Sequence, residues 1–257
     1  MSSNLEVHMF PCLSDNYGYL IHDAANNLTA TIDTPDAHAI QDALDKKGWT
    51  LTHILNTHHH ADHAGGNLAL KESSGCTIVG AGHDARRIPG IDVKVQEGDV
   101  CQFGDHSIQV LETPGHTLGH IVYYIPGQSM AFVGDTLFAM GCGRLFEGSA
   151  DQMWSSLSKL LEWPDETVIY CAHEYTLANG KFAMSVDPLN PDLQQRMKEV
   201  EQLRSNNQPT IPTNMKVEKA TNPFLRAEAD SLIQYLGMQG KSAVDVFAET
   251  RSRKDNF

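Results

Sequence analysis

The segment from His58 to His63 concentrates side chains that bind metal ions. His58 and His60 are two residues apart, directly after a short apolar run that is typical of a strand. Alternate side chains of extended backbone point to the same face, so both imidazoles can reach one ion while His59 points elsewhere. Asp62 and His63 follow where a helix is expected to begin, and they offer one oxygen and one nitrogen to a second position nearby. This spacing indicates a metal-dependent hydrolase with the core of its metal site here.

Three more candidate ligands follow short apolar strands in the same way: His116, Asp135 and His173. Side chains at the ends of strands can converge at one edge of a sheet assembly. The resulting seven donors exceed the four ligands of one zinc ion, and they fit two ions that share one carboxylate. Nitrogen and oxygen donors without a thiolate suit zinc, iron or manganese, so the donor set leaves the metal open. Two such ions, about 3.5–4 Å apart, would hold a bridging hydroxide and polarise a substrate oxygen.

Each of these residues has a simpler interpretation when it is taken alone. Asp62 would be a helix N-cap, Asp135 a turn residue, and the single histidines surface or core residues. The joint pattern of spacing and strand-end placement favours metal binding over these interpretations. His59 and His120 are candidates to orient a ligand from behind, and the remaining histidines are expected to be structural.

Short apolar runs alternate with turns through the first two-thirds of the chain, a pattern typical of strands. Strands are expected at residues 5–10, 17–22, 28–32, 53–56, 77–80, 107–112, 121–125, 130–133 and 167–171. Helical spacing of apolar residues predicts helices at 36–47, 67–73 and 150–162. After about residue 175 strand signals vanish, and helices separated by prolines are expected at 176–186, 192–206, 225–236 and 243–252. We therefore predict an α/β body over residues 1–174 and an all-helical appendage over residues 175–257.

Composition and charge indicate which kinds of molecule the protein does not bind. The 257 residues carry a formal net charge of −13, which repels nucleic-acid phosphates and anionic lipid. No apolar run is long enough to cross a bilayer, and the first residues do not resemble a secretory signal. The five cysteines are scattered and odd in number, which argues against a disulfide framework and for a reducing compartment. These features predict a cytoplasmic protein, expected to be a monomer, that binds neither nucleic acid nor membrane.

The metal-binding segment, with Thr57 before it, resembles the signature of the metallo-β-lactamase superfamily. Within that superfamily the chain is similar to the glyoxalase II (hydroxyacylglutathione hydrolase) family. The similarity rests on residues 57–66, 113–120, 134–138, 141–144, 171–176 and 251–257. The first segment indicates the superfamily alone, whereas the His-Glu-Tyr-Thr run and the tail ending Arg-Lys-Asp-Asn-Phe indicate the family. The resemblance implies an αββα sandwich with a dinuclear metal site at one edge, followed by a helical substrate-binding domain.

The resemblance also implies a role for each candidate ligand. One metal ion, most simply zinc, would be held by His58, His60 and His116. The second would be held by Asp62, His63 and His173. Asp135 would bridge the two ions, and Asp62 would also orient the hydroxide.

Glutathione is the implied binding partner of a second set of residues: Arg144, Phe146, Tyr175, Arg251 and Lys254. Arg144 stands where lysine is common in the family, which keeps the charge but changes the donor geometry. Phe146 stands where tyrosine is common, so a hydroxyl contact is lost. An acidic protein needs a local basic patch to hold the free carboxylates of glutathione, and these cations are candidates for it.

The reaction implied is hydrolysis of S-(2-hydroxyacyl)glutathione, such as S-D-lactoylglutathione, to glutathione and D-lactate, the second step of methylglyoxal detoxification. Five alternative functions remain. A single-iron persulfide dioxygenase typically lacks the full second ligand set that Asp62, His63 and His173 provide. A lactonase or β-lactamase would not explain the basic tail, and a nuclease would want a basic surface. A non-catalytic metal or glutathione sensor would not need seven intact ligands.

Overall fold

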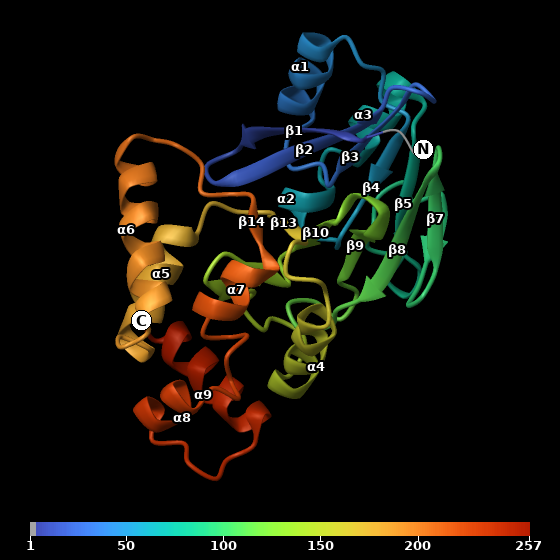
Figure 1. Ribbon diagram of the computed structural model, residues 1–257. Coiled ribbons are helices and arrows are strands. Elements are labelled where there is room, and N and C mark those ends of the chain that lie inside the picture. Colours follow the sequence, from blue (N-terminus) through green and yellow to red (C-terminus); the bar gives the residue numbers. More distant parts are fainter. Residues whose placement is uncertain (1–3) are drawn as a thin grey trace. The chain divides into compact units, whose positions relative to one another are not determined.

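The computed structural model describes residues 4–257, and the chain divides into two compact units (Figure 1). The first unit contains Met1–Glu112 and Gly119–Gly134. The second unit contains Thr113–Leu118 and Asp135–Phe257. Among the described residues, no helix is long and apolar enough to cross a membrane.

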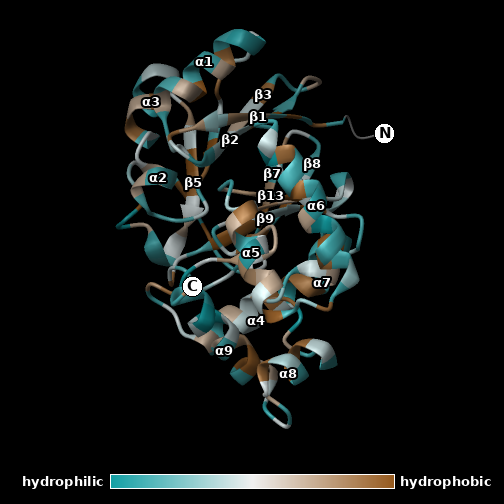
Figure 2. Cartoon of the chain, turned by 90° about the vertical axis from the view of Figure 1, so that its left-hand side faces the viewer, coloured by the Kyte–Doolittle hydropathy of each residue, from teal (hydrophilic) through white to brown (hydrophobic). Residues whose placement is uncertain are grey.

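A six-stranded sheet forms one layer of the first unit. Its strands, in spatial order, are β1 (Glu6–Cys12), β2 (Asn16–Asp23), β3 (Leu28–Ile32), β4 (His53–Leu55), β5 (Thr77–Ala81) and β6 (Val93–Val95). The first three strands pair antiparallel, and the pairs from β3 to β6 are parallel. Helices α1 (Ala37–Lys47) and α3 (Asn67–Ser74) lie together against this sheet. Both helices show hydrophilic and hydrophobic residues along their length, as expected of helices with one buried face (Figure 2).

A second group of strands forms the other layer of the first unit. It contains β7 (Val100–Phe103), β8 (His106–Glu112), β9 (Ile121–Ile125) and β10 (Met130–Gly134), each antiparallel to the next. Two contacts connect this layer to the six-stranded sheet. The Tyr123 hydroxyl donates to the Asn56 carbonyl at 2.8 Å, and the rings of Tyr19 and Phe132 meet edge to face at 5.7 Å. The core of the first unit therefore lies between the two layers.

The second unit is mainly helical. Its helices are α4 (Ala150–Leu161), α5 (Thr176–Val186), α6 (Pro191–Ser205), α7 (Met215–Thr221), α8 (Asp230–Leu236) and α9 (Ala243–Asp255). Its strands form two short antiparallel pairs, β11 (Leu137–Phe138) with β12 (Gly141–Cys142) and β13 (Val168–Cys171) with β14 (Thr213–Asn214). Ser149 and Ser242 begin α4 and α9 with complete capping boxes, which satisfy the first amides of each helix.

The predicted elements of the body are all present, and the differences lie in the tail and in short strands of the body that were not predicted. The expectation that strands vanish after residue 175 is wrong, because β14 pairs with Val168 and Ile169. The helix expected at 225–236 begins only at Asp230. The apolar residues at the start of the predicted helix lie in turns, where Leu225 and Ala227 are buried. Their apolar spacing therefore reflects burial in turns and not a helix.

Helix α7 has no counterpart in the sequence prediction. One of the three residues that it buries is a carboxylate, Glu218, and another is Thr221. Apolar periodicity is therefore weak in this helix. The strands β6, β7, β11 and β12, each of two to four residues, were also missed.

Candidate metal and substrate site

Four candidate ligands lie together in the first unit, around the start of the short helix α2 (Ala61–Ala64). His58 Nε2 and His60 Nδ1 are 3.0 Å apart, and His63 Nε2 is 3.6 Å from Asp62 Oδ2. The backbone of His60 is extended and begins α2, so the strand end and the first helical turn present the four side chains together. His58 and His63 are fully buried, which keeps water from competing for their nitrogens.

The carboxylate of Asp33 holds two residues of this segment, Thr57 and His63, in place. It accepts hydrogen bonds from the Thr57 amide and hydroxyl, both at 2.7 Å, and it lies 2.8 Å from Nδ1 of His63. A proton held on Nδ1 leaves Nε2 of His63 as the metal-binding atom. Asp33 has a left-handed backbone with φ of 58°, which is unusual for a residue other than glycine. Asp33 is not among the residues predicted for the site, although it directly follows β3 and so shares the strand-end position of other candidate ligands.

His59 and His120, the two candidates for orienting a ligand, both lie beside His58. His59 Nδ1 lies 3.0 Å from Asp84 Oδ2, and the ring of His59 contacts that of His60, with centroids 4.8 Å apart. The ring of His120 stacks on that of His58, with centroids 4.8 Å apart. Alternation along the extended backbone directs the Nδ1 atom of His59 to Asp84, while its ring stays beside those of His58 and His60.

Three candidate ligands lie together in the second unit. Asp135 Oδ2 is 3.4 Å from Nε2 of His116, and Asp135 Oδ1 is 3.4 Å from Nε2 of His173. The two oxygens of one carboxylate thus face two different histidines, which is the arrangement that a bridging ligand requires. Nδ1 of His116 lies 2.9 Å from the Arg144 carbonyl, so a proton on Nδ1 leaves Nε2 for a metal.

These residues fit a divalent metal centre. Ligands of a tetrahedral ion with bonds of about 2.0–2.1 Å are about 3.3 Å apart. The four ligand-atom separations within the units lie between 3.0 and 3.6 Å, close to that edge length. All seven candidates belong to His and Asp groups that could hold a metal ion: His58, His60, Asp62, His63, His116, Asp135 and His173.

All the glutathione-contact candidates lie in the second unit, and two of them are aromatic rings beside its histidines. The ring of Tyr175 stacks almost parallel on that of His173, with centroids 4.7 Å apart. The ring of Phe146 meets that of His116 at 5.2 Å and is 61% exposed. Both rings are therefore accessible surfaces directly beside the ligands of this unit.

The basic candidates gather around Asp255. Its carboxylate lies 2.9 Å from Arg251 Nη2 and 3.5 Å from Arg144 Nε. Arg251 is buried, donates to the Cys142 carbonyl at 3.0 Å and lies over the ring of Phe224. Arg144 is exposed and is the more available cation.

Burial shifts the titration of two further groups in this region. Burial lowers the pKa of Lys254, whose ammonium lies over the rings of Phe182 and Phe257. Burial raises the pKa of Cys142 to about 11, against the opposing effect of Arg251. The Cys142 thiol is therefore protonated at neutral pH and is a poor nucleophile.

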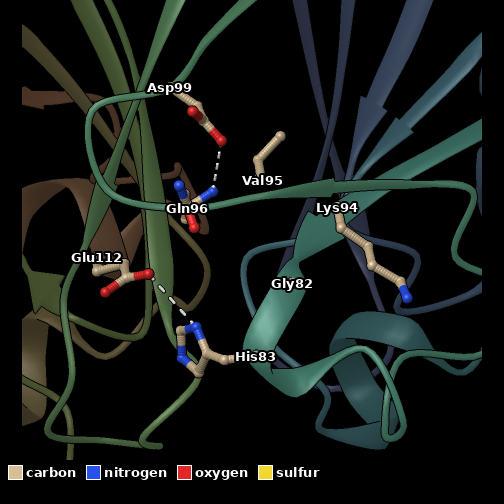
Figure 3. Close-up of a pocket in the computed structure, with 7 residues that line it drawn as sticks. All are labelled: Gly82, His83, Lys94, Val95, Gln96, Asp99 and Glu112. Atoms are coloured by element: carbon tan, nitrogen blue, oxygen red, sulfur yellow. Dashed lines mark hydrogen bonds and ion pairs between the residues drawn. The ribbon is translucent and has the colours of Figure 1, made fainter.

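A pocket of about 620 Å³ in the first unit contains none of these residues. It is lined by Gly82, His83, Lys94, Val95, Gln96, Asp99 and Glu112. His83 and Glu112 face each other in it at 3.4 Å, and Asp99 accepts the Gln96 amide at 2.9 Å (Figure 3).

Two protein families match the chain, and their matches meet directly after His173, the last candidate ligand. The metallo-beta-lactamase superfamily matches residues 31–173. The family described as hydroxyacylglutathione hydrolase C-terminus matches residues 174–257.

Curated relatives match over nearly the whole chain. A protein of Maricaulis maris named hydroxyacylglutathione hydrolase is 54% identical over 255 residues, which cover 99% of this chain and all of the relative. A Rhizobium meliloti protein of the same name is 54% identical over 253 residues, 98% of this chain and 99% of the relative.

Solved structures with the same fold include the crystal structure of ETHE1 from Myxococcus xanthus, with a TM-score of 0.66 and 27% identity. That match covers 99% of this chain and all of the other. The BLEG-1 B3 metallo-beta-lactamase has a TM-score of 0.64 and 21% identity, over 86% of this chain and 99% of the other, so this likeness concerns the fold alone.

Proposed function

Because this chain belongs to the hydroxyacylglutathione hydrolase family of the metallo-beta-lactamase superfamily, we propose that it hydrolyses the thioester of S-(2-hydroxyacyl)glutathione. S-D-lactoylglutathione would yield glutathione and D-lactate, the second step of methylglyoxal detoxification. The observation that carries the proposal is the Asp135 carboxylate, whose two oxygens face two histidines in a chain that matches such enzymes along its length.

The proposed ligand sets follow the family. His58, His60 and His116 would hold one divalent cation, and Asp62, His63 and His173 the other, with Asp135 shared between them. Zinc is the first candidate, with iron or manganese as alternatives, because the donors are nitrogen and oxygen only. When bound, the two ions would supply a shared hydroxide at neutral pH and polarise the thioester carbonyl.

The chain's own residues would orient the reaction. Asn16 donates to Asp62 Oδ2 at 3.3 Å and to the Asp62 carbonyl at 3.3 Å, which holds that carboxylate in one direction. Asp62 would in turn accept a hydrogen bond from the attacking oxygen. The departing sulfur needs no proton donor, because a thiolate is stable close to neutral pH.

Glutathione would be recognised by residues of the second unit. Arg144, Arg251 and Lys254 would neutralise its carboxylates, and the rings of Phe146 and Tyr175 would pack against its backbone. We further propose that residues 1–174 form the catalytic domain and residues 175–257 the substrate-binding domain of a cytoplasmic monomer.

The test is turnover of S-D-lactoylglutathione by the purified protein, with the release of free thiol and the metal content measured together. We expect rapid turnover of this thioester and much slower turnover of S-lactoylcysteamine, which has the same acyl group without the glutathione carboxylates. Equal rates for the two thioesters would contradict glutathione recognition. Oxygen uptake with glutathione persulfide, in place of thioester hydrolysis, would favour the dioxygenase alternative and overturn the proposal.

A further inference from the structure

The hairpin formed by β11 and β12 joins two parts of the second unit's ligand group. Asp135 lies two residues before β11 and Arg144 two residues after β12, and the Arg144 carbonyl orients His116. The chain returns closely against its own start, because a Cβ at Gly143 would lie only 2.0 Å from the Asp135 carbonyl oxygen. The position of this hairpin therefore affects the position of two candidate ligands.

The hairpin also touches the third ligand of the unit. The Phe138 ring, at the end of β11, meets the ring of His173 edge to face at 5.8 Å. It meets the ring of Tyr175 at 5.3 Å in the same manner. A displaced hairpin would thus disturb His173 as well as the glutathione-contact candidate beside it.

Two buried side chains hold the turn of this hairpin: Glu218, in the middle of α7, and Asn222, which follows its last residue. We call them the α7 clamp. Glu218 Oε2 accepts the Met140 amide at 2.8 Å. Asn222 Nδ2 donates to the carbonyls of Phe138 and Gly141 at 3.0 and 2.9 Å. The α7 clamp therefore bonds the backbone on both sides of the turn.

Packing of the core does not require a carboxylate at position 218. The side chain is fully buried, where burial raises its pKa, and an apolar residue would fill the same space without desolvating a carboxylate. Its oxygens are all engaged, since it also accepts from the Thr213 hydroxyl at 2.8 Å and from Asn222 at 3.1 Å. The amide that it accepts belongs to Met140, whose φ of 55° is left-handed and unfavourable for a side chain. A buried acceptor at this point stabilises a turn that the local sequence does not favour.

We propose that Glu218, acting with Asn222, is a positioning residue that holds the hairpin so that Asp135, His116 and His173 keep the geometry of a metal site. The expected effect on metal affinity depends only on the geometry of the candidate ligands. The expected effect on turnover rests on the proposed function. The C-terminal helices would then contribute to metal binding as well as to substrate binding.

The experiment compares zinc affinity, measured by competition with a chelator, for Glu218→Ala and Glu218→Gln in the full chain. The alanine variant leaves the Met140 amide without its acceptor, and we expect zinc affinity to fall by about 10–100-fold, as for other residues that support metal ligands. Glutamine keeps one oxygen for Met140 and an amide for the Thr213 hydroxyl, so it should restore affinity close to that of the wild type. In turnover per folded chain, kcat of the alanine variant should fall by a larger factor than KM rises, because three metal-ligand candidates depend on the hairpin and only part of the substrate contact does.

The matched control is Asn190→Ala. Asn190 is also buried, and its side-chain amide donates to the Ala220 carbonyl and to the Asp187 carboxylate, neither of which belongs to the hairpin. We expect it to lower the unfolding temperature without changing zinc affinity. Wild-type zinc affinity in Glu218→Ala, or an equal loss in Asn190→Ala, would overturn the proposal. If Glu218→Ala does not fold, Asn222→Ala is judged by the same criterion.

These readouts separate the positioning role from the proposed function. Zinc affinity is measured without substrate, so a protein that binds zinc through the α7 clamp but does not hydrolyse S-D-lactoylglutathione would contradict only the proposed function. A protein that hydrolyses the thioester and keeps its zinc affinity in Glu218→Ala would contradict only the positioning role.

Discussion

The candidate ligands of the two units are organised in different ways. The first unit presents its four ligands from one short segment, His58 to His63, with Asp33 behind it. The second unit draws His116, Asp135 and His173 from separate strand ends and relies on backbone contacts and a hairpin to align them. A contiguous ligand segment needs only one supporting carboxylate, whereas dispersed ligands need a fold to bring them together. The second group should therefore be the more sensitive to distant changes.

The largest effect is expected from Asp135→Ala, which removes the carboxylate that faces both histidines of the second unit. We expect the protein to bind fewer than two metal ions per chain and kcat to fall by about a thousandfold or more, because charge neutralisation by a second ion contributes several kcal/mol. Metal analysis of the purified variant and initial rates measure the two effects. Asp165→Ala, which alters an exposed pair with Lys219, is the control and should change neither. Two bound ions with full activity in Asp135→Ala would rule out the bridging role.

Asp33→Asn tests the corresponding support in the first unit. Asparagine presents an amide where the carboxylate now meets Thr57 and His63, so His63 loses the partner that orients it. We expect metal affinity to fall by about 10–100-fold.

Asp36→Ala is the control for Asp33→Asn. Asp36 caps α1, and its loss should cost about 1 kcal/mol of stability without affecting metal affinity. Equal metal affinity in the Asp33 variant and the wild type would show that the first segment needs no support.

A smaller effect, confined to the second unit, is expected from Arg144→Ala and Lys254→Ala. Each removes a cation proposed to bind a glutathione carboxylate, so KM should rise by about tenfold while kcat changes little. Steady-state kinetics with S-D-lactoylglutathione separate the two constants. Arg253→Ala, whose exposed guanidinium pairs with Glu249, should leave KM unchanged. A fall in kcat without a change in KM would assign these cations to the chemistry instead.

The smallest effect compares one buried thiol in each unit. Burial raises the pKa of Cys12 to about 12 and that of Cys142 to about 11, from a value of 9.0 for an accessible thiol. The folded state therefore binds more protons than the unfolded state above pH 9, and stability should fall as pH rises from there toward the folded values. Denaturant unfolding of the wild type should show this slope. Cys142→Ala should reduce the loss of stability with rising pH between about pH 9 and pH 11, and Cys12→Ala should reduce it between about pH 9 and pH 12. A slope that neither variant changes would contradict the assignment.

Local features of the fold and of the site were predictable from the sequence. The arrangement of the four candidate ligands from His58 to His63 follows from local backbone structure, because side chains alternate on extended backbone and a helix begins directly afterwards. The strands of the body were predictable because each is apolar and bounded by turn residues. The likeness to the metallo-β-lactamase superfamily, inferred from these residues, is confirmed by the family match over residues 31–173.

Features that depend on tertiary contacts were not predictable. β14 has only two residues and exists because β13 pairs with it. α7 buries Glu218, and the reason for a buried carboxylate is a backbone amide far away in the chain, at Met140. Asp33 carried a usable strand-end signal, but only the folded chain brings it to His63.

The most direct test of the account is metal reconstitution of the metal-free protein, followed by S-D-lactoylglutathione turnover at each step. We predict that two equivalents of zinc bind per chain, and that full turnover appears only with the second equivalent, because both proposed ligand sets must be filled. Full turnover at one equivalent, or two bound equivalents without thioester hydrolysis, would contradict it.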